Sequence, residues 1–398
     1  MADPQEEERP ARRGRGKRWM KGALVVLFAA TLAWLLAPTV LGGPEPPPLW
    51  TEADLPIAAV APAENGWPEM VSPVRSTNPF PREILDLLAA DKEGRPRTER
   101  ARALRAPLAA ALDTEPARET LAAFERAIQK PRFADTCPAA VAEPCIVFPL
   151  FSAHRTALLA SIRKAEGGDW PSSITLLAKT LRADIDFVTT ARSSLVAYLI
   201  AIASLRDASE VASDLFETYR VERARDPSIP PLGEGAVAAL TSLDAALAGF
   251  DPSALNGRRG IIADYLFTHK AVDQVTTLES WLLHDTGDAA APGSGGTVKS
   301  RLFRFFASLL LDRGATQSEL NARYKALHDA VAASAPPPSF PLERDKPFWW
   351  LYNLTGKALL DVRQVDWSEP LGKMSEGSAR IEALRPGLRK LSQDLSRI

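Results

Sequence analysis

Histidine, cysteine and paired acidic residues are the side chains of this 398-residue chain that could support catalysis or bind a metal. The four histidines are far apart in the sequence, and none belongs to an H-E-x-x-H arrangement. They are His154, His269, His284 and His328. Scattered histidines in helices are usually packed or solvated, so we expect no metal site and no cofactor.

Two pairs of aspartates could act as the two carboxylates of a glycosidase. The pairs are Asp184 with Asp186 and Asp361 with Asp366. That chemistry requires particular separations in space, which sequence does not give, and solvated helix faces are the alternative interpretation. A G-x-S-x-G nucleophile motif is absent from the sequence. No catalytic residue is therefore predicted.

One glycine-rich stretch is similar to a phosphate-binding loop. Residues 293–300 read GSGGTVKS, which departs from G-x-x-x-x-G-K-[ST] at Val298, where the loop needs glycine. Because no strand precedes this stretch, we interpret it as a flexible loop.

The only two cysteines, Cys137 and Cys145, lie close together in TCPAAVAEPC. In an oxidising compartment two such thiols normally pair, so we predict a disulfide that pins a local turn. The alternatives are a redox couple or a metal pair. Redox motifs favour C-x-x-C spacing, and a structural zinc site needs about four ligands.

Two polar and aromatic stretches are candidates for ligand binding. The residues are Trp349, Trp350, Tyr352, Asn353, Gly356 and Lys357, together with Asn65 and Trp67. The aromatic side chains could form a shelf for a glycan or peptide, with amide and ammonium groups as donors. The structural alternative places the aromatic rings in the core, Asn353 at a helix cap, Gly356 at a close helix contact, and the Asn65–Gly66 turn on the domain surface.

The elements that would position these residues follow an apolar segment, residues 22–41. It has 20 residues and no charge, which matches the roughly 30 Å hydrocarbon core of a bilayer. Residues 1–21 hold seven Lys or Arg, and the next basic residue is Arg75. The positive-inside rule then predicts a cytoplasmic tail, one transmembrane helix and a periplasmic remainder. A cleaved signal peptide, with a shorter apolar region, is the alternative.

Residues 42–81 are expected to form a proline-rich periplasmic linker, since ten prolines fall between Pro44 and Pro81. Such a segment should be extended and semi-rigid. The net charge of the chain is −1, which gives no reason to expect a nucleic-acid partner.

Residues 82–398 show helical periodicity and no convincing strand, so we predict an all-α fold of roughly a dozen helices in a bundle or array. A helix over residues 148–166 should end at Gly167 and Gly168, and Asp169 should cap the next one. The apolar run at residues 195–205 is expected to be a central buried helix. A break is expected near Asp207 and Ser209, and another at Pro386.

Two stretches resemble a family of uncharacterised, membrane-anchored, all-helical periplasmic proteins of Gram-negative bacteria. The first is W-x3-I-x2-L-x3-L-x-A-D-I-D-F at residues 170–187, followed by SLVAYLIAIA at residues 194–203. The second is YNLTGKALL at residues 352–360, where Leu354 replaces the proline that is usual in the family. The resemblance implies a single-pass anchor and a helical body, and it implies no activity.

These features favour an interaction or scaffold module in the cell envelope. We expect one membrane span and an envelope protein or a cell-wall component as partner. A membrane-tethered envelope hydrolase and a ligand-binding module are the alternatives, and an enzyme is less favoured than a protein without catalytic activity.

Overall fold

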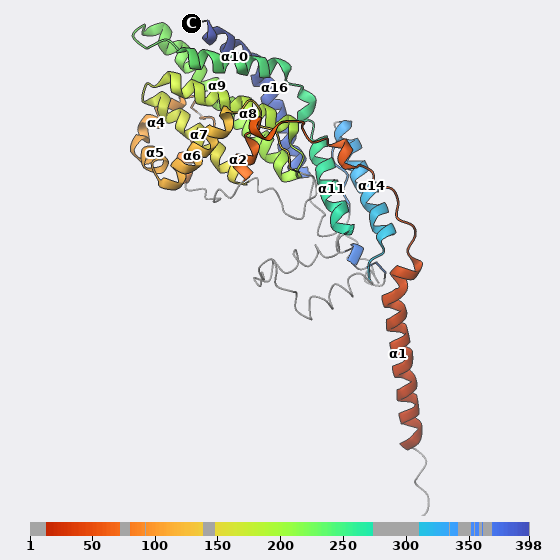
Figure 1. The fold of residues 1–398 in the computed structure, drawn as a ribbon. Helices are drawn as coiled ribbons and strands as arrows, with labels where there is room; N and C mark the ends of the chain where they lie inside the picture. The colour runs from red at the N-terminus through yellow and green to blue at the C-terminus, as the bar shows by residue number, and fades with distance from the viewer. Residues whose placement is uncertain are drawn as a thin grey trace, which may run out of the picture. The chain divides into compact units, whose positions relative to one another are not determined.

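In the computed structural model, every regular element of the described part of the chain is a helix (Figure 1). This part comprises residues 13–71, 80–91, 93–137, 148–273, 310–333, 335–340, 352–353, 355–357, 360 and 368–397. Within these ranges there is no β-strand, and the only bridge of strand type joins Asn65 and Arg132. The predicted all-α class is therefore confirmed.

The chain divides into two compact units. The first contains residues 1–49, 269–323 and 340–365, and the second contains residues 50–268, 324–339 and 366–398. Helix α14 (Arg313–Ala332) and helix α11 (Arg258–Asp273) each contribute to both units.

Helix α1 (Arg13–Leu41) is the long helix of the first unit, and it ends where the apolar segment of the sequence ends. Five successive side chains, residues 24–28, are each 65–69% exposed. Among the described residues, no helix is both long enough and apolar enough to cross a membrane.

The described part of the first unit also contains the start of α14, which packs against the chain that follows α1. A Cβ placed on Gly314 would lie 2.5 Å from the carbonyl oxygen of Gly43, so the two backbones are in contact there. Asn321 donates from Nδ2 to the carbonyl oxygen of Pro47 at 3.0 Å.

Residues 50–71 of the predicted linker are packed in the second unit rather than extended as a free spacer. They form two short 3-10 helices, η1 (Glu52–Asp54) and η2 (Pro62–Glu64), and the helix α2 (Trp67–Val71). Leu55, Trp67 and Met70 are each 1% exposed. Burial of these apolar side chains holds the segment on the helical body.

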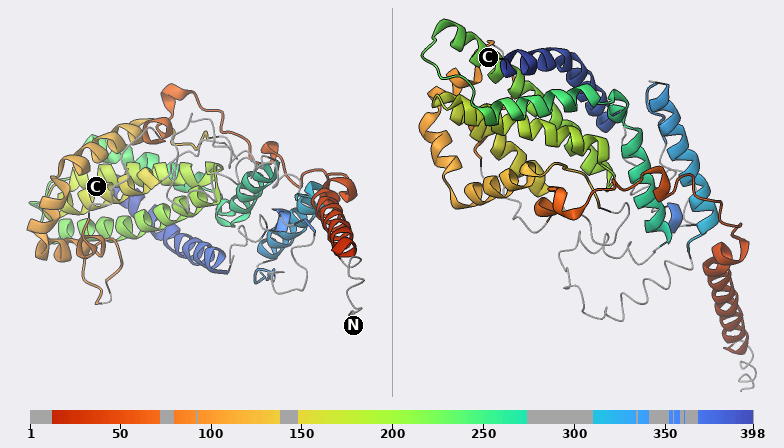
Figure 2. Two further views of the ribbon diagram at one scale, coloured as in Figure 1. Left: turned by 90° about the horizontal axis from the view of Figure 1, so that it is seen from below. Right: turned by 45° about the horizontal axis from the view of Figure 1, so that its top comes forward.

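Five helices of the second unit surround its core (Figures 1 and 2). They are α7 (Phe148–Glu166), α8 (Trp170–Thr190), α9 (Leu195–Arg225), α10 (Glu234–Gly249) and α16 (Ser368–Ser396). Helices α8 and α9 pack on each other, α7 contacts both, α10 packs on α8, and α16 packs on α9 and α10. The apolar run of α9 is buried, as predicted, at Tyr198, Ala201 and Leu205.

Shorter helices cover α7. They are α3 (Arg82–Leu85), α4 (Arg97–Ala103), α5 (Arg105–Leu112) and α6 (Glu115–Gln129). Helices α4, α5 and α6 contact α7, and α2 contacts α6 and α7. One cluster of buried apolar residues extends from Trp67 to Leu395.

Two predicted helix boundaries are confirmed and two predicted breaks are wrong. Helix α7 ends at Glu166, and the Asp169 side chain caps α8 by accepting from the backbone N–H of Ser172 at 3.2 Å. Helix α9 continues past Asp207, whose carboxylate binds Arg206 instead of capping a new helix.

Helix α16 likewise continues through Pro386. The proline ring lies on the exposed side, while Ile381 and Leu388 are buried on either side of it. Packing of both halves therefore outweighs the hydrogen bond that the proline removes.

Residues 252–273 form two separate helices, η3 (Pro252–Leu255) and α11. Gly257 lies between them with φ of 76°, a left-handed conformation that favours glycine.

Candidate functional site

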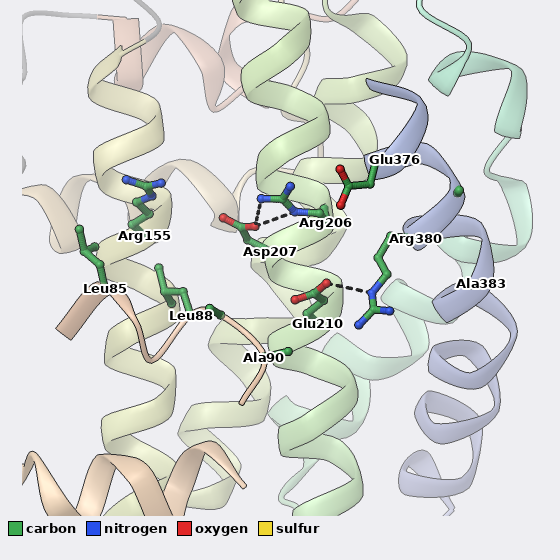
Figure 3. A pocket seen from close by; sticks show the side chains of 12 residues that line it. Leu85, Leu88, Ala90, Arg155, Arg206, Asp207, Glu210, Glu376, Arg380 and Ala383 are labelled. Atoms are coloured by element: carbon green, nitrogen blue, oxygen red, sulfur yellow. Dashed lines mark hydrogen bonds and ion pairs between the residues drawn. The ribbon is translucent and has the colours of Figure 1, made fainter. Parts of the chain in front are cut away.

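A groove in the second unit has charged and apolar walls and a volume of about 760 Å³ (Figure 3). We call it the charged groove. Its lining comes from the α3 segment, α7, α9 and α16, with α9 between the other two long helices. Leu85, Leu88 and Ala383 supply apolar surface. The charged lining residues are three arginines and three acids: Arg155, Arg206, Arg380, Asp207, Glu210 and Glu376.

Four of these six charges are already paired with one another. Arg206 donates to Oδ1 of Asp207 from Nη2 at 2.7 Å and from Nε at 3.1 Å. Arg380 donates from Nε to Oε1 of Glu210 at 3.0 Å. These pairs are drawn as dashed lines in Figure 3. They fix the side chains on α9 and connect α9 to α16.

Arg155 has no such pairing in the described part of the chain. Its guanidinium carbon lies 3.9 Å from the centre of the Phe151 ring, one turn earlier on α7. The Nε atom is buried and has no hydrogen-bond partner. Burial lowers the pKa of the Arg155 guanidinium from its ordinary value, and the Asp207 charge opposes this shift. A buried donor without an acceptor is unfavourable, so this arginine is suited to bind an anion.

A second cavity of about 530 Å³ shares Ala90, Glu210 and Arg380 with the charged groove. Arg97 lies in its wall and donates from its backbone N–H to Oδ2 of Asp214 at 2.9 Å. The two hollows therefore form one continuous depression along α9.

His154 and Asp184 form the one buried histidine–acid pair in the described ranges. Nε2 of His154 lies 2.9 Å from Oδ2 of Asp184, and the two residues are 0% and 4% exposed. Burial is the main cause that raises the pKa of the Asp184 carboxyl, and His154 counteracts it. Nδ1 of His154 has no hydrogen-bond partner. No described hydroxyl or thiol therefore completes a nucleophile–base–acid triad with this pair.

The predicted binding residues Asn65 and Trp67 are structural. Asn65 receives hydrogen bonds at Oδ1 from the backbone N–H groups of Ala134 and Trp67, and it donates from Nδ2 to the carbonyl oxygen of Ala134. The Trp67 ring packs against Phe133 and Phe187. We call this arrangement the Asn65 latch. Its polar atoms are occupied and its residues are buried, so it offers nothing to a ligand.

Gly66 belongs to the Asn65 latch, and its backbone lies close to the backbone of α6. A Cβ at this position would lie 2.1 Å from the carbonyl oxygen of Ala127, and the Gly66 N–H donates to the carbonyl oxygen of Arg132 at 3.0 Å. The turn therefore fits only without a side chain.

Tyr352 and Asn353 also have structural roles, in the first unit. The Tyr352 hydroxyl donates to Oδ2 of Asp312, while Oδ1 of Asp312 accepts from Ala315 N–H at 2.9 Å and caps α14. Oδ1 of Asn353 accepts from the backbone N–H of Asp312 at 2.8 Å, and Nδ2 donates to Oγ1 of Thr316 at 3.0 Å. Asn353 has φ of 53°, which asparagine tolerates better than most residues.

Gly356 is the small residue that this arrangement requires, since a Cβ there would lie 2.0 Å from Oγ1 of Thr316. The expected close contact of Gly356 is therefore confirmed. Lys357 is half-buried beside it. Trp349 and Trp350 lie outside the described residues, so their role stays a prediction.

The other residues singled out in the sequence have structural contacts or lie outside the described residues. Cys137 is 6% exposed and its Sγ accepts from Nε1 of Trp67 at 3.2 Å. Cys145 lies outside the described residues, so the disulfide stays a prediction. His284, Asp361, Asp366 and residues 293–300 are also outside them. Asp186 accepts a bidentate ion pair from Arg132, whereas Asp184 is bound to His154, so the two carboxylates have different partners.

Within the described ranges, no group of three or more His, Cys, Asp or Glu side chains could hold a metal ion. Comparison of the chain with protein-family models, with curated proteins and with solved structures finds no match. The function must therefore be inferred from the geometry alone.

Sequence reasoning did not single out the charged groove. Its residues lie in four separate segments, and each resembles an ordinary solvated helix face. One usable signal was Arg155, a charge within the largely apolar stretch of α7 and one turn after Phe151. That spacing places a cation over an aromatic ring.

Proposed function

We propose that the protein is an inner-membrane protein anchored by α1 and that its helical body binds other components of the cell envelope in the periplasm. The observation that carries the anchor is the exposure of apolar side chains on α1. Eight of the ten large apolar residues that are exposed in the described ranges lie on this helix. They are Leu24, Val25, Val26, Leu27, Phe28, Leu32, Val40 and Leu41.

These side chains surround the helix rather than forming one stripe. Five successive residues cover more than the 3.6 residues of one α-helical turn, so residues 24–28 expose apolar surface in every direction. A helix that is apolar all round is stable when it is surrounded by lipid or protein. The seven basic residues in positions 1–21 favour lipid and the cytoplasmic placement of that tail. The proposed anchor therefore rests on the exposure of these side chains and on the charge of the tail that precedes them.

The binding role is supported by the charged groove. Ligand sites in proteins are commonly concave, about 300–1,000 Å³ in volume, and lined by apolar groups with a few polar ones. The groove of about 760 Å³ has this size and this mixture. A tethered hydrolase is less well supported, because the His154–Asp184 pair is buried and has no nucleophile beside it.

Membrane extraction tests the anchor. The full chain should stay in the membrane fraction after an alkaline carbonate wash. Leu32→Arg should release part of it, because an arginine at the centre of a span costs about 2.5–3.5 kcal/mol on the insertion scale. Val40→Arg, near the end of the segment, is the matched control and should have less effect. Release of the unaltered chain into the soluble fraction would refute the anchor.

Reporter fusions test the topology. Alkaline phosphatase fused after residue 398 should be active, and a fluorescent reporter that matures only in the cytosol should be dark. The opposite pattern would refute the periplasmic placement.

A further inference from the structure

The charged groove retains one cation and one anion after its internal ion pairs are counted. Arg206 is bound to Asp207, and Arg380 is bound to Glu210. Arg155 and Glu376 remain, and neither has a hydrogen bond or ion pair with another described side chain. They lie on opposite walls of the groove, on α7 and α16, with α9 between them (Figure 3).

Arg155 is held ready for an anion. Its stack on Phe151 restricts the plane of the guanidinium. The Asp207 charge acts on it, but no described acid is hydrogen-bonded to it. Fixing the guanidinium plane lowers the entropy lost when a ligand binds. A guanidinium can donate two parallel hydrogen bonds to one carboxylate, which gives both affinity and orientation.

Glu376 supplies the complementary charge at the other wall. It is exposed. Its negative charge acts on Arg206, but Arg206 is already hydrogen-bonded to Asp207. A carboxylate in this position can accept hydrogen bonds from an ammonium group. Leu85 and Leu88 add apolar surface on the Arg155 side of the groove (Figure 3).

We propose that the charged groove binds a short zwitterionic peptide, whose free carboxylate pairs with Arg155 and whose free ammonium pairs with Glu376. A zwitterionic peptide would be the ligand of the proposed binding module. The inference therefore rests on the proposed binding role and not on the membrane anchor. A dianion such as phosphate fits less well, because Asp207, Glu210 and Glu376 would all repel it. A peptide leaves Asp207 and Glu210 in their present pairs and satisfies the two remaining charges, Arg155 and Glu376.

Calorimetric titration of the purified full chain in detergent tests this assignment. The probes are tetra-alanine, its N-acetyl form and its C-terminal amide. Tetra-alanine should bind, and each blocked form should bind about tenfold more weakly, since each loses one charge-assisted contact. Arg155→Gln should lower the affinity for tetra-alanine by a similar factor but leave the affinity for the C-terminal amide unchanged. Glu376→Gln should leave the affinity for the N-acetyl form unchanged.

Two variants of similar type control for general charge effects. Arg163→Gln lies two turns further along α7, where Arg163 binds Asp113 outside the groove. Glu369→Gln lies two turns before Glu376 on α16, where Glu369 binds Lys373. Neither should change peptide affinity. Arg155→Lys keeps the charge without the planar fork and should give an intermediate affinity.

Several results would overturn the assignment. They are no binding of tetra-alanine at millimolar concentration, equal affinity of the Arg155→Gln variant, or tighter binding of inorganic phosphate than of the peptide. Circular dichroism of each variant shows whether it is folded, and Arg155→Lys remains a test if Arg155→Gln is not. Because the chain is purified, a negative result leaves the membrane anchor standing, and failure of the anchor leaves a positive titration standing.

Discussion

The Asn65 latch and the charged groove both contain polar side chains. In the latch the side-chain amide of Asn65 is hydrogen-bonded within the protein, whereas in the groove Nε of Arg155 has no hydrogen-bond acceptor. Asn65 is 2% exposed, and both ends of its amide are hydrogen-bonded. Arg155 is half-buried and its Nε has no acceptor. The difference teaches that a polar residue is a better candidate for binding when its hydrogen-bonding capacity is left unused. Replacing residues of the latch should therefore cost stability, whereas replacing the two groove charges without an ion pair, Arg155 and Glu376, should cost little.

Trp67→Ala should give the largest loss of stability. The indole is 1% exposed between Phe133 and Phe187, and truncating a buried tryptophan costs about 3–5 kcal/mol. Chemical denaturation of the full chain measures the change. Ile57→Ala, in the same segment at a side chain that is 50% exposed, is the control and should cost far less. A loss below about 1 kcal/mol for Trp67→Ala would show that the latch is not a packing device.

Gly66→Ala should cost about 1–3 kcal/mol, as other overpacking changes do. The added methyl would lie 2.1 Å from the carbonyl oxygen of Ala127, so the turn must move away from α6. Gly235→Ala places its methyl in open space on α10 and should not destabilise the protein. Equal denaturation midpoints for the two variants would refute the close approach.

Asp184→Asn should change how stability depends on pH. Burial raises the native pKa of Asp184, so between its ordinary value of 3.8 and that raised value the native state holds more protons than the unfolded chain. The unfolding free energy then falls as pH rises through this window, by at most about 1.4 kcal/mol per pH unit. The variant should lack this slope in urea titrations.

Asp113→Asn provides the comparison of opposite sign. The hydrogen bond from Arg163 holds the pKa of Asp113 below its ordinary value. Its stabilisation is present above pH 3.8 and is lost as pH falls through the lowered native pKa. If both variants altered the slope in the same direction, the buried and exposed acids would not differ as described.

Glu376→Gln should have the smallest effect on stability, within about 0.5 kcal/mol, because it has no described partner and is exposed. The same variant should lose about tenfold in peptide affinity, as one charge-assisted contact is removed. A large loss of stability in this variant would show that Glu376 has a structural role, as the residues of the Asn65 latch do.

Local signals in the sequence predicted much of the second unit. The paired glycines 167 and 168 and the Asp169 cap mark the boundary between α7 and α8, because each acts over only a few residues. The breaks expected near Asp207 and at Pro386 failed for a different reason. Packing of α9 and α16 on their neighbours outweighs the local preference, and such packing depends on residues distant in sequence.

The candidate site was harder to predict than the fold. The stretches containing Asn65 and Tyr352 attracted attention because asparagine, glycine and aromatic residues are concentrated there, yet these types also build tight turns. The charged groove joins Leu85, Arg155, Asp207 and Glu376 from four segments. Only the folded chain shows which of these charges are paired and which are not.

Helix α16 has a consequence for biogenesis. Leu388 and Leu395 are 1% and 0% exposed, and Ser392 donates to the carbonyl oxygen of Leu240, so residues near position 395 complete a core that begins at Trp67. A nascent chain that lacks this helix leaves the facing surfaces of α9 and α10 uncovered. Proteases should therefore degrade products that stop before α16, and the stable protein should accumulate only after synthesis has passed that helix.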